Sequence, residues 1–306
     1  MKVTVVGAGF VGKMVAHRIL QRDLADVVLT DIVEGLPQGL ALDMMQSAPI
    51  EGFSSSIVGA NDYAATEGSD VVVITAGLAR QPGMSRADLI GKNTQIISQV
   101  VREVAPRSPE AVLMVVTNPL DEMVHVAASV SGFDKPRVMG QAGMLDSARF
   151  RYFIAEAVGC RPGDVEAATL GSHGEIMVAL PRLATVKGRP VSELLDKQTL
   201  DSISERTRDG GAEIVGLLKK GSAYFAPSSG TVAMVEAVLK DTKASMPVCA
   251  WVTGQYGLSD IFLGVPAKLG RGGVIEIEEW DLDEAELAEL HAAAGIVRER
   301  VEGLGL

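Results

Sequence analysis

One histidine of this sequence stands in a setting suited to proton transfer, the glycine-bounded turn Gly171-Ser172-His173-Gly174. An imidazole titrates near neutral pH, so a histidine on such a turn can take a proton and return it. Asp146 is a candidate partner, because a carboxylate can orient the second ring nitrogen and stabilise the imidazolium. A purely structural histidine is the alternative. The remaining histidines lie in helical patterns and are interpreted as structural: His17, His125 and His291.

Asp146 and Arg149 are three residues apart in the segment 145–151. On a helix their side chains share a face, and an intrahelical ion pair worth ~0.2–0.5 kcal/mol is the structural interpretation. If both side chains point inward, Arg149 can instead bind a carboxylate with two parallel hydrogen bonds. Arg151 cannot share that face and is interpreted as structural.

Two further arginines, Arg80 and Arg86, lie in the glycine- and proline-containing segment GLARQPGMSR of residues 77–86. A loop of this kind after a strand suits a lid that closes over an anion. Ser85 and Asp88 have the spacing of a capping box, which predicts a helix beginning at the far end of the loop. Two solvated surface arginines are the alternative.

A glycine motif follows the first predicted strand: Gly7-Ala8-Gly9-Phe10-Val11-Gly12 has the form G-x-G-x-x-G. The glycines permit a tight turn and close approach of a pyrophosphate to the N-terminus of the next helix. Any strand–turn–helix can use such glycines, so the motif alone is weak. Asp31 lies nineteen residues beyond Gly12, where a carboxylate hydrogen-bonds an adenosine ribose and repels a 2′-phosphate. The sequence therefore predicts NAD in preference to NADP.

The elements that must position these residues alternate through the first half of the chain. Four continuous apolar runs predict strands covered on both faces: Val3–Val6, Val27–Thr30, Val71–Thr75 and Ala111–Val116. The clearest helical pattern between them runs from Leu89 to Val104 and is stopped by Pro106. This alternation predicts a parallel sheet with right-handed crossovers.

Val116 and Asn118 follow the fourth of these strands, at the edge where the carboxyl ends of parallel strands line a crevice. The functional interpretation is that the Asn118 amide touches substrate and nicotinamide. The local alternative is a helix cap, with Pro119 in the first turn. The second half is less regular, with a strand-like piece at Val274–Ile277 and a charged helix from Asp283 to about Val301.

Composition narrows the classes of partner. Lysine and arginine total 28 against 39 aspartate and glutamate, giving a net charge of −11 that disfavours nucleic acid and anionic membranes as partners. No apolar run approaches the ~18 residues of a spanning helix. Cys160 and Cys249 form neither a disulfide framework nor a zinc pattern. We expect a cytoplasmic protein without a metal that binds a small molecule.

The motifs GAGFVG, AGLARQPGMSR, VTNP, LDSARF and GSHGE occur in the order found in the lactate/malate dehydrogenase superfamily, which the chain resembles over essentially its whole length. The resemblance implies an α/β fold class, with an N-terminal Rossmann doubly wound parallel sheet in residues 1–143. An α+β substrate-binding and catalytic domain follows in residues 144–306. Segments such as GSAYFAPSSG resemble the lactate dehydrogenase-like malate enzymes of bacteria.

The resemblance also implies a role for each candidate residue. His173 matches the proton acceptor, Asp146 its partner, and Arg149 the arginine that binds the C1 carboxylate of a 2-hydroxy acid. Arg86 matches a lid arginine that polarises the C2 carbonyl, and Arg80 stands where malate enzymes carry arginine and many lactate enzymes carry glutamine. The remaining matches are cofactor or pocket positions: Asn93, Val116, Asn118 and Ala223.

Three other interpretations stay open at this point. They are a lactate dehydrogenase, an enzyme of another 2-hydroxy acid, and a non-catalytic NAD-binding sensor or scaffold on the same fold. The resemblance also implies a homo-oligomer, a tetramer or a dimer. The apolar stripe Leu36, Leu40, Met44 and Met45 could serve as core or as contact surface.

Overall fold

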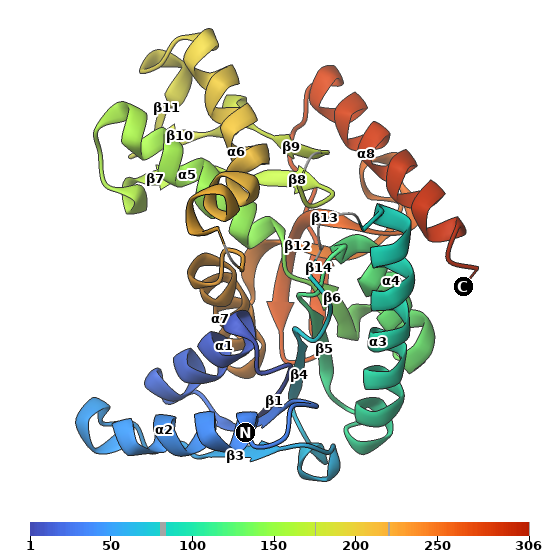
Figure 1. Ribbon diagram of the computed structural model, residues 1–306. Helices are drawn as coiled ribbons and strands as arrows, with labels where there is room; N and C mark the ends of the chain where they lie inside the picture. The colour runs from blue at the N-terminus through green and yellow to red at the C-terminus, as the bar shows by residue number, and fades with distance from the viewer. Residues whose placement is uncertain (80–83, 175, 220, 306) are drawn as a thin grey trace.

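Figure 1 shows the computed structural model, which describes residues 1–79, 84–174, 176–219 and 221–305. The first half forms a parallel sheet in the order β3-β2-β1-β4-β5-β6. Its strands are β1 (Lys2–Val6), β2 (Asp26–Thr30), β3 (Ile57–Ala60), β4 (Val71–Ile74), β5 (Val112–Val115) and β6 (Val138–Gly140). The predicted Rossmann fold and its four predicted strands are confirmed. The short strands β3 and β6 were not predicted.

Four helices connect these strands: α1 (Phe10–Gln21), α2 (Leu36–Glu51), α3 (Arg86–Arg107) and α4 (Leu120–Ser131). The predicted capping box is present at the start of α3, where Ser85 Oγ accepts from the Asp88 N–H at 3.1 Å. Pro106 lies inside the last turn of α3, and the helix continues one residue past the proline, to Arg107. In α2, Met44 is buried while Leu36 is 37% exposed, so the predicted stripe is only partly core.

The second half extends the sheet with antiparallel strands. These are β8 (Thr169–Gly171), β9 (Met177–Ala179), β12 (Ala244–Thr253), β13 (Ser259–Gly270) and β14 (Gly273–Ile277). A separate small sheet contains β7 (Val165–Glu166), β10 (Thr185–Val186) and β11 (Arg189–Pro190). β12 pairs with β6 at Cys249 and Gly140, so one sheet runs through both halves.

The helices of the second half are α5 (Gly143–Val158), α6 (Lys197–Leu218), α7 (Phe225–Leu239) and α8 (Glu284–Glu302). Short 3-10 segments complete the assignment: η1 (Ala64–Thr66), η2 (Lys135–Arg137), η3 (Pro162–Asp164), η4 (Pro181–Leu183), η5 (Val191–Glu193) and η6 (Gln255–Gly257). The predicted terminal helix is α8, with Asp283 as its N-cap in a second capping box. The predicted strand at Val274–Ile277 forms most of β14.

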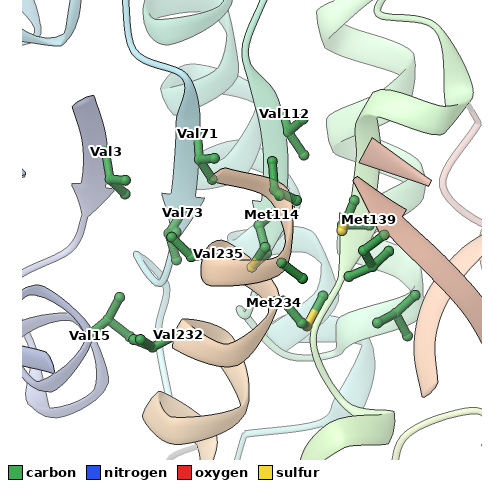
Figure 2. Close-up of a cluster of buried hydrophobic side chains, with 14 of the residues drawn as sticks. Val3, Val15, Val71, Val73, Val112, Met114, Met139, Val232, Met234 and Val235 are labelled. Carbon is green, nitrogen blue, oxygen red and sulfur yellow. The ribbon is translucent and has the colours of Figure 1, made fainter. Parts of the chain in front are cut away.

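The core joins the two halves. Figure 2 shows Val235 of α7 near Val73 and Met114 of the parallel sheet and Val232 of α7 beside Val15 of α1, and all five residues are fully buried. Burying a valine side chain stabilises a fold by ~1.5–3 kcal/mol, so α7 anchors the second half onto the first. In the part of the chain that the structure describes, no helix has the length and apolar character needed to cross a membrane.

Candidate active site

The glycine motif forms the turn between β1 and α1. Gly7 has a φ of +101°, which favours glycine, and a Cβ there would lie 2.7 Å from Ala76 N. A Cβ at Gly12 would lie 1.8 Å from the Gly7 carbonyl oxygen, so this position excludes any side chain. A Cβ at Gly9 would meet no atom of the described chain within 4 Å. Gly7 and Gly12 are therefore required by the protein itself, whereas Gly9 leaves open space above the turn.

The N-terminus of α1 fits an anion. Its cap residue Gly9 supplies no side-chain hydrogen bond, and the first turn contains no acidic residue. The first turn of α1 therefore supplies no negative side chain of its own to the positive end of the helix dipole. Phe10 is 52% exposed here and stacks on Tyr224 of the second half, with ring centroids 5.3 Å apart. A pyrophosphate suits this end of the helix.

Asp31 lies just beyond β2, beside the glycine turn. Its carboxylate accepts hydrogen bonds from the N–H of Ala8 at 2.7 Å and of Val33 at 2.9 Å. It borders a 340 Å³ cavity at the carboxyl ends of β1, β2 and β4, whose wall includes Gly9 and Tyr63. The predicted ribose-binding carboxylate and the predicted pyrophosphate turn therefore adjoin one cavity, and the donor set fits a dinucleotide.

Asn93 lies on α3 behind the wall of this region. Its side chain is buried, with Oδ1 accepting from Leu78 N at 2.8 Å and Nδ2 donating to Asn118 O at 2.6 Å and to Leu78 O at 3.1 Å. These bonds hold the segment after β4 against the segment after β5. The direct cofactor contact of Asn93 stays a prediction.

A second cavity, of 260 Å³, adjoins the first turn of α1 through Val11. Val116, Asn118 and Ala223, which the resemblance implies as cofactor or pocket positions, line it together with Arg149 and His173. Pro119, not Asn118, is the N-cap of α4, so the alternative in which Asn118 caps a helix is wrong. The remaining lining residues are Gln141, Leu145, Gly174, Arg208, Gly211, Val215, Ser222 and Pro227.

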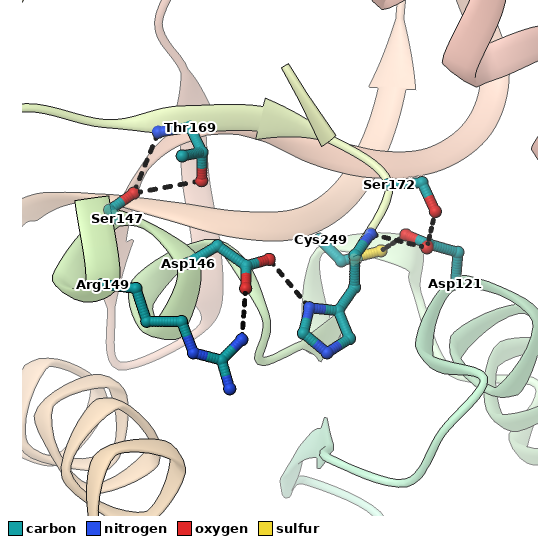
Figure 3. Close-up of polar contacts among 8 residues, drawn as sticks. Asp121, Asp146, Ser147, Arg149, Thr169, Ser172 and Cys249 are labelled. Carbon is teal, nitrogen blue, oxygen red and sulfur yellow. Dashed lines mark hydrogen bonds and ion pairs between the residues drawn. The ribbon is translucent and has the colours of Figure 1, made fainter. Parts of the chain in front are cut away.

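Asp146 connects the two predicted functional side chains. Its Oδ2 lies 2.8 Å from His173 Nδ1, and its Oδ1 accepts from Arg149 Nη1 at 3.2 Å. Figure 3 shows Asp146 and Arg149 on α5 with their side chains turned to the same side. The Asp146 side chain is 3% exposed, so it is shielded from water on the side away from the cavity. The predicted pairing of His173 with Asp146 is present.

The electrostatics of the group favour a proton on His173. Burial lowers the pKa of His173, but the charge and hydrogen bond of Asp146 outweigh burial, and the pKa is raised above 6.5. Arg149 adds a smaller lowering. Since Asp146 binds Nδ1, the other ring nitrogen, Nε2, is the one left for a ligand.

Arg149 is a buried cation whose hydrogen-bonding capacity is not fully used by the described residues. Its side chain is 11% exposed and packs against Gly210 of α6, where a Cβ would lie 3.0 Å from Arg149 Cδ. Nε of Arg149 is buried without a hydrogen-bond partner among the described residues. Burial lowers the pKa of Arg149, and Asp146 opposes that effect. A guanidinium in this state suits a carboxylate ligand, which offers acceptor oxygens for its remaining N–H groups.

The two arginines of the predicted lid, Arg80 and Arg86, have side chains outside the described part of the structure. Arg80 lies outside the described residues. Arg86 is the first residue of α3, and its side chain is likewise outside the description. Arg151, interpreted from the sequence as structural, donates from Nε to Val165 O at 2.6 Å.

The sequence reasoning missed three polar residues at this site: Asp121, Ser172 and Arg208. Arg208 lines the cavity and donates from Nε to Met177 O at 3.2 Å. Asp121 accepts from Ser172 Oγ at 2.5 Å beneath the histidine turn. For Arg208, its helical spacing from Gly211 and Val215 was an available signal. For Asp121, no local pattern of the sequence indicates a contact with Ser172, which lies 51 positions away.

Three larger hollows, of 750, 660 and 570 Å³, lie elsewhere on the described surface. None of them is lined by a histidine among its described residues, and none is lined by a residue of the glycine turn. The described residues also contain no group of three or more histidine, cysteine, aspartate or glutamate side chains that could hold a metal ion. The chemistry therefore concentrates at the smaller cavity with His173.

Known proteins resemble this chain along its whole length. The family model described as lactate/malate dehydrogenase, NAD binding domain, matches residues 1–140, and the model of the family's alpha/beta C-terminal domain matches residues 143–304. Malate dehydrogenase from Roseiflexus castenholzii is 51% identical over 303 residues, covering 99% of this chain and 98% of that protein.

Solved structures agree with this. Malate dehydrogenase from Salinibacter ruber superposes with a TM-score of 0.96 at 49% identity, covering 100% of this chain and 98% of that one. Lactate dehydrogenase from Cryptosporidium parvum, solved with lactic acid and nicotinamide adenine dinucleotide, gives 0.96 at 40% identity, covering 99% and 98%. The chain belongs to the lactate/malate dehydrogenase family.

Proposed function

We propose that the chain is an NAD-dependent malate dehydrogenase that interconverts (S)-malate and oxaloacetate. The observation that carries the proposal is the Asp146–His173–Arg149 group, set in a cavity beside the glycine turn of a dinucleotide-binding sheet. An acid–base group and a carboxylate-binding cation on one cavity wall suit a 2-hydroxy acid. Bound NAD supplies the hydride acceptor, and NADH the hydride donor.

In the proposed mechanism, Arg149 binds the C1 carboxylate of the substrate and fixes C2 near His173. Nε2 of His173 takes the hydroxyl proton during malate oxidation and returns a proton to the carbonyl oxygen during oxaloacetate reduction. Asp146 keeps Nδ1 protonated and stabilises the imidazolium, as carboxylates do in other acid–base pairs. Arg86, on the lid, polarises the C2 carbonyl as charge develops on oxygen. Closure of the lid excludes water and strengthens these interactions.

Malate is preferred over lactate because of Arg80 and the named relatives. Arg80 binds the second carboxylate of a four-carbon diacid in this proposal, and Ala223 on the cavity wall leaves room for it. Pyruvate offers only a methyl group there, so Arg80 would be buried without a partner at a cost of several kcal/mol. The Roseiflexus and Salinibacter relatives named malate dehydrogenase support this substrate.

Further parts of the proposal follow from the same family membership. NAD is preferred to NADP because Asp31 lies at the ribose side of the cavity and its charge repels a 2′-phosphate. We propose residues 1–143 as the cofactor domain and 144–306 as the catalytic domain, supported by the family models that end at 140 and begin at 143. We also propose that the protein forms a homotetramer or a homodimer. The cytoplasm is the proposed compartment, since the free thiols of Cys160 and Cys249 suit a reducing environment.

The test of the substrate follows the absorbance of NADH in the presence of oxaloacetate or pyruvate, with wild type and Arg80→Gln. We expect wild type to oxidise NADH with oxaloacetate and to discriminate against pyruvate by orders of magnitude. Arg80→Gln is expected to reverse or strongly reduce that ratio. An unchanged ratio removes Arg80 from the role, and no NADH oxidation with either keto acid refutes the proposed function.

A further inference from the structure

A buried carboxylate that the proposed mechanism does not use lies behind the histidine turn. Asp121 is in the first turn of α4, and the residue is 2% exposed. Its Oδ2 accepts from Ser172 Oγ at 2.5 Å and from the His173 backbone N–H at 3.3 Å. Its Oδ1 accepts from Cys249 Sγ at 3.4 Å (Figure 3). Three donors from two other elements thus converge on one carboxylate.

Asp121 lies close in the chain to one wall of the substrate cavity and bonds to residues of the opposite half. Asn118, on the cofactor side of the substrate cavity, precedes Asp121 by three residues at the start of α4. Ser172 and His173 follow β8, which belongs to the second half of the chain. Asp121 therefore links the cavity wall formed by one half to the acid–base turn formed by the other, over a few covalent bonds on each side.

We propose that Asp121 is a positioning residue, which holds the His173 turn in register with the Asn118 segment through the Ser172 hydroxyl and the His173 N–H. This inference rests on the proposed function, since it assigns what keeps His173 at hydride-transfer geometry. A buried carboxylate is costly unless its oxygens are satisfied, and both oxygens of Asp121 accept hydrogen bonds here.

The same carboxylate also acts on His173 through its charge. Burial raises the pKa of Asp121, and the bonds from Ser172, Cys249 and the His173 N–H oppose that rise. The charge of Asp121 adds to that of Asp146 in raising the pKa of His173. The charged or titratable groups of the described chain that face this turn are Asp121 from α4, Asp146 and Arg149 from α5, Arg208 from α6 and Cys249 from β12.

Two variants separate positioning from charge. Ser172→Ala removes the 2.5 Å contact and leaves the carboxylate; we expect kcat for oxaloacetate reduction to fall about tenfold, with KM and NADH affinity within twofold of wild type. Asp121→Asn keeps an accepting oxygen for the Ser172 hydroxyl and the His173 N–H but removes the negative charge. We expect the pH at which kcat is half-maximal to move down by about half a unit to one unit, following the pKa of His173.

Cys249→Ala is the matched control, because Cys249 donates to Oδ1 of the carboxylate, whereas the Ser172 hydroxyl and the His173 N–H donate to Oδ2. It is expected to keep wild-type kcat and pH profile, whatever it does to the melting temperature. Variants at Ser172 and Asp121 that lower the melting temperature but leave kcat and the pH profile at wild-type values would overturn the positioning role.

Titration of the His173 ring protons by NMR in wild type and Asp121→Asn reads the electrostatic effect without turnover. A downward shift of the His173 pKa supports the effect of the Asp121 charge, and an identical titration refutes that effect, whereas the kinetics of Ser172→Ala decide the positioning role. If His173 of the wild type titrates with a raised pKa but the protein reduces no 2-keto acid, the proposed function is refuted. The two failures are therefore distinguishable.

Discussion

At the scale of single residues, the site contains a carboxylate shared between a base and a cation. Asp146 contacts both His173 and Arg149. When His173 is neutral, the positive charge of Arg149 balances the negative charge of Asp146. When His173 is protonated, the three side chains together carry one net positive charge. A bound carboxylate at Arg149 and a proton on His173 thus favour each other electrostatically.

His173→Asn should lower kcat by about a thousandfold, within the range by which acid–base groups accelerate proton transfer. NADH affinity should stay at its wild-type value, because the glycine turn and Asp31 lie on another cavity. Stopped-flow or steady-state kinetics with oxaloacetate, together with fluorescence titration of NADH, measures both quantities. Activity within tenfold of wild type would show that another group transfers the proton.

The pH dependence of the two directions should be opposite. Oxaloacetate reduction needs His173 protonated, so kcat/KM falls as pH rises through a pKa above the ordinary histidine value of 6.5. Malate oxidation needs the neutral ring, so its kcat/KM rises through the same pKa. Profiles measured in both directions between pH 5 and 9 check this, and two limbs that move in the same direction would contradict it.

At the scale of elements, the site is built from residues at the carboxyl ends of strands and near the N-termini of helices. The turn after β1 lines the 340 Å³ cavity, the segment after β5 supplies Asn118, and α5 presents Asp146 and Arg149 on one face. Each of these could be predicted, because the signal is local: a glycine pattern after an apolar run, or two charges three residues apart. The turn of His173 was likewise marked by its glycines.

Gly12→Ala and Gly9→Ala should differ in what they damage. A Cβ at Gly12 meets the Gly7 carbonyl at 1.8 Å, so the turn itself must shift and both the melting temperature and NADH binding should fall. A Cβ at Gly9 meets nothing of the described chain within 4 Å, so the melting temperature without cofactor should stay unchanged while NADH binding weakens. Thermal unfolding with and without NADH measures both, and equal apoprotein stability for the two variants would contradict the assignment.

What could not be predicted is non-local. β3 (Ile57–Ala60) is an edge strand of four residues with Gly59 inside it, and β6 has only three residues, so neither offers the long apolar run that marks a covered strand. The pairing of β12 with β6 involves residues 109 positions apart, Cys249 and Gly140. Asp121 resembles an ordinary acidic residue in a first helical turn, and only the tertiary fold brings it to Ser172.

At the scale of the whole molecule, the two halves share one sheet and one core, and buried polar groups cross between them. His125 of α4 is an example, because its Nε2 accepts from the Phe262 N–H of β13 at 3.1 Å and its ring packs edge-on against Phe262 and Trp251. Burial, with a smaller contribution from Lys135, lowers the pKa of His125 to about 4. The native fold therefore needs this ring neutral.

Acid should destabilise the protein through His125. Its pKa is about 4 when folded and near 6.5 when unfolded, so the unfolded state binds a proton first as pH falls below 6.5. The contribution is complete above pH 6.5 and is lost toward pH 4, by about 2 kcal/mol at pH 5. Chemical denaturation of wild type and His125→Gln at pH 5 and 7.5 measures it, with His17→Gln as the control. A wild-type pH dependence in His125→Gln would contradict this role.

The oligomer is tested on the intact protein. Exposed apolar side chains on α2, such as Leu42 at 63% and Ile50 at 87%, are consistent with a contact surface between copies of the chain. Light scattering coupled to size exclusion at micromolar concentration should give two or four times 32.2 kDa. A monomeric mass would refute the proposed homo-oligomer without affecting the catalytic group.

In the proposed enzyme, one arginine binds each carboxylate of a four-carbon diacid, beside a histidine that transfers the proton. The ratio of kcat/KM for oxaloacetate to that for pyruvate, measured with purified wild type and NADH at neutral pH, tests this selection. We expect a ratio of about a thousand or more in favour of oxaloacetate. A ratio near one, or a preference for pyruvate, would contradict it.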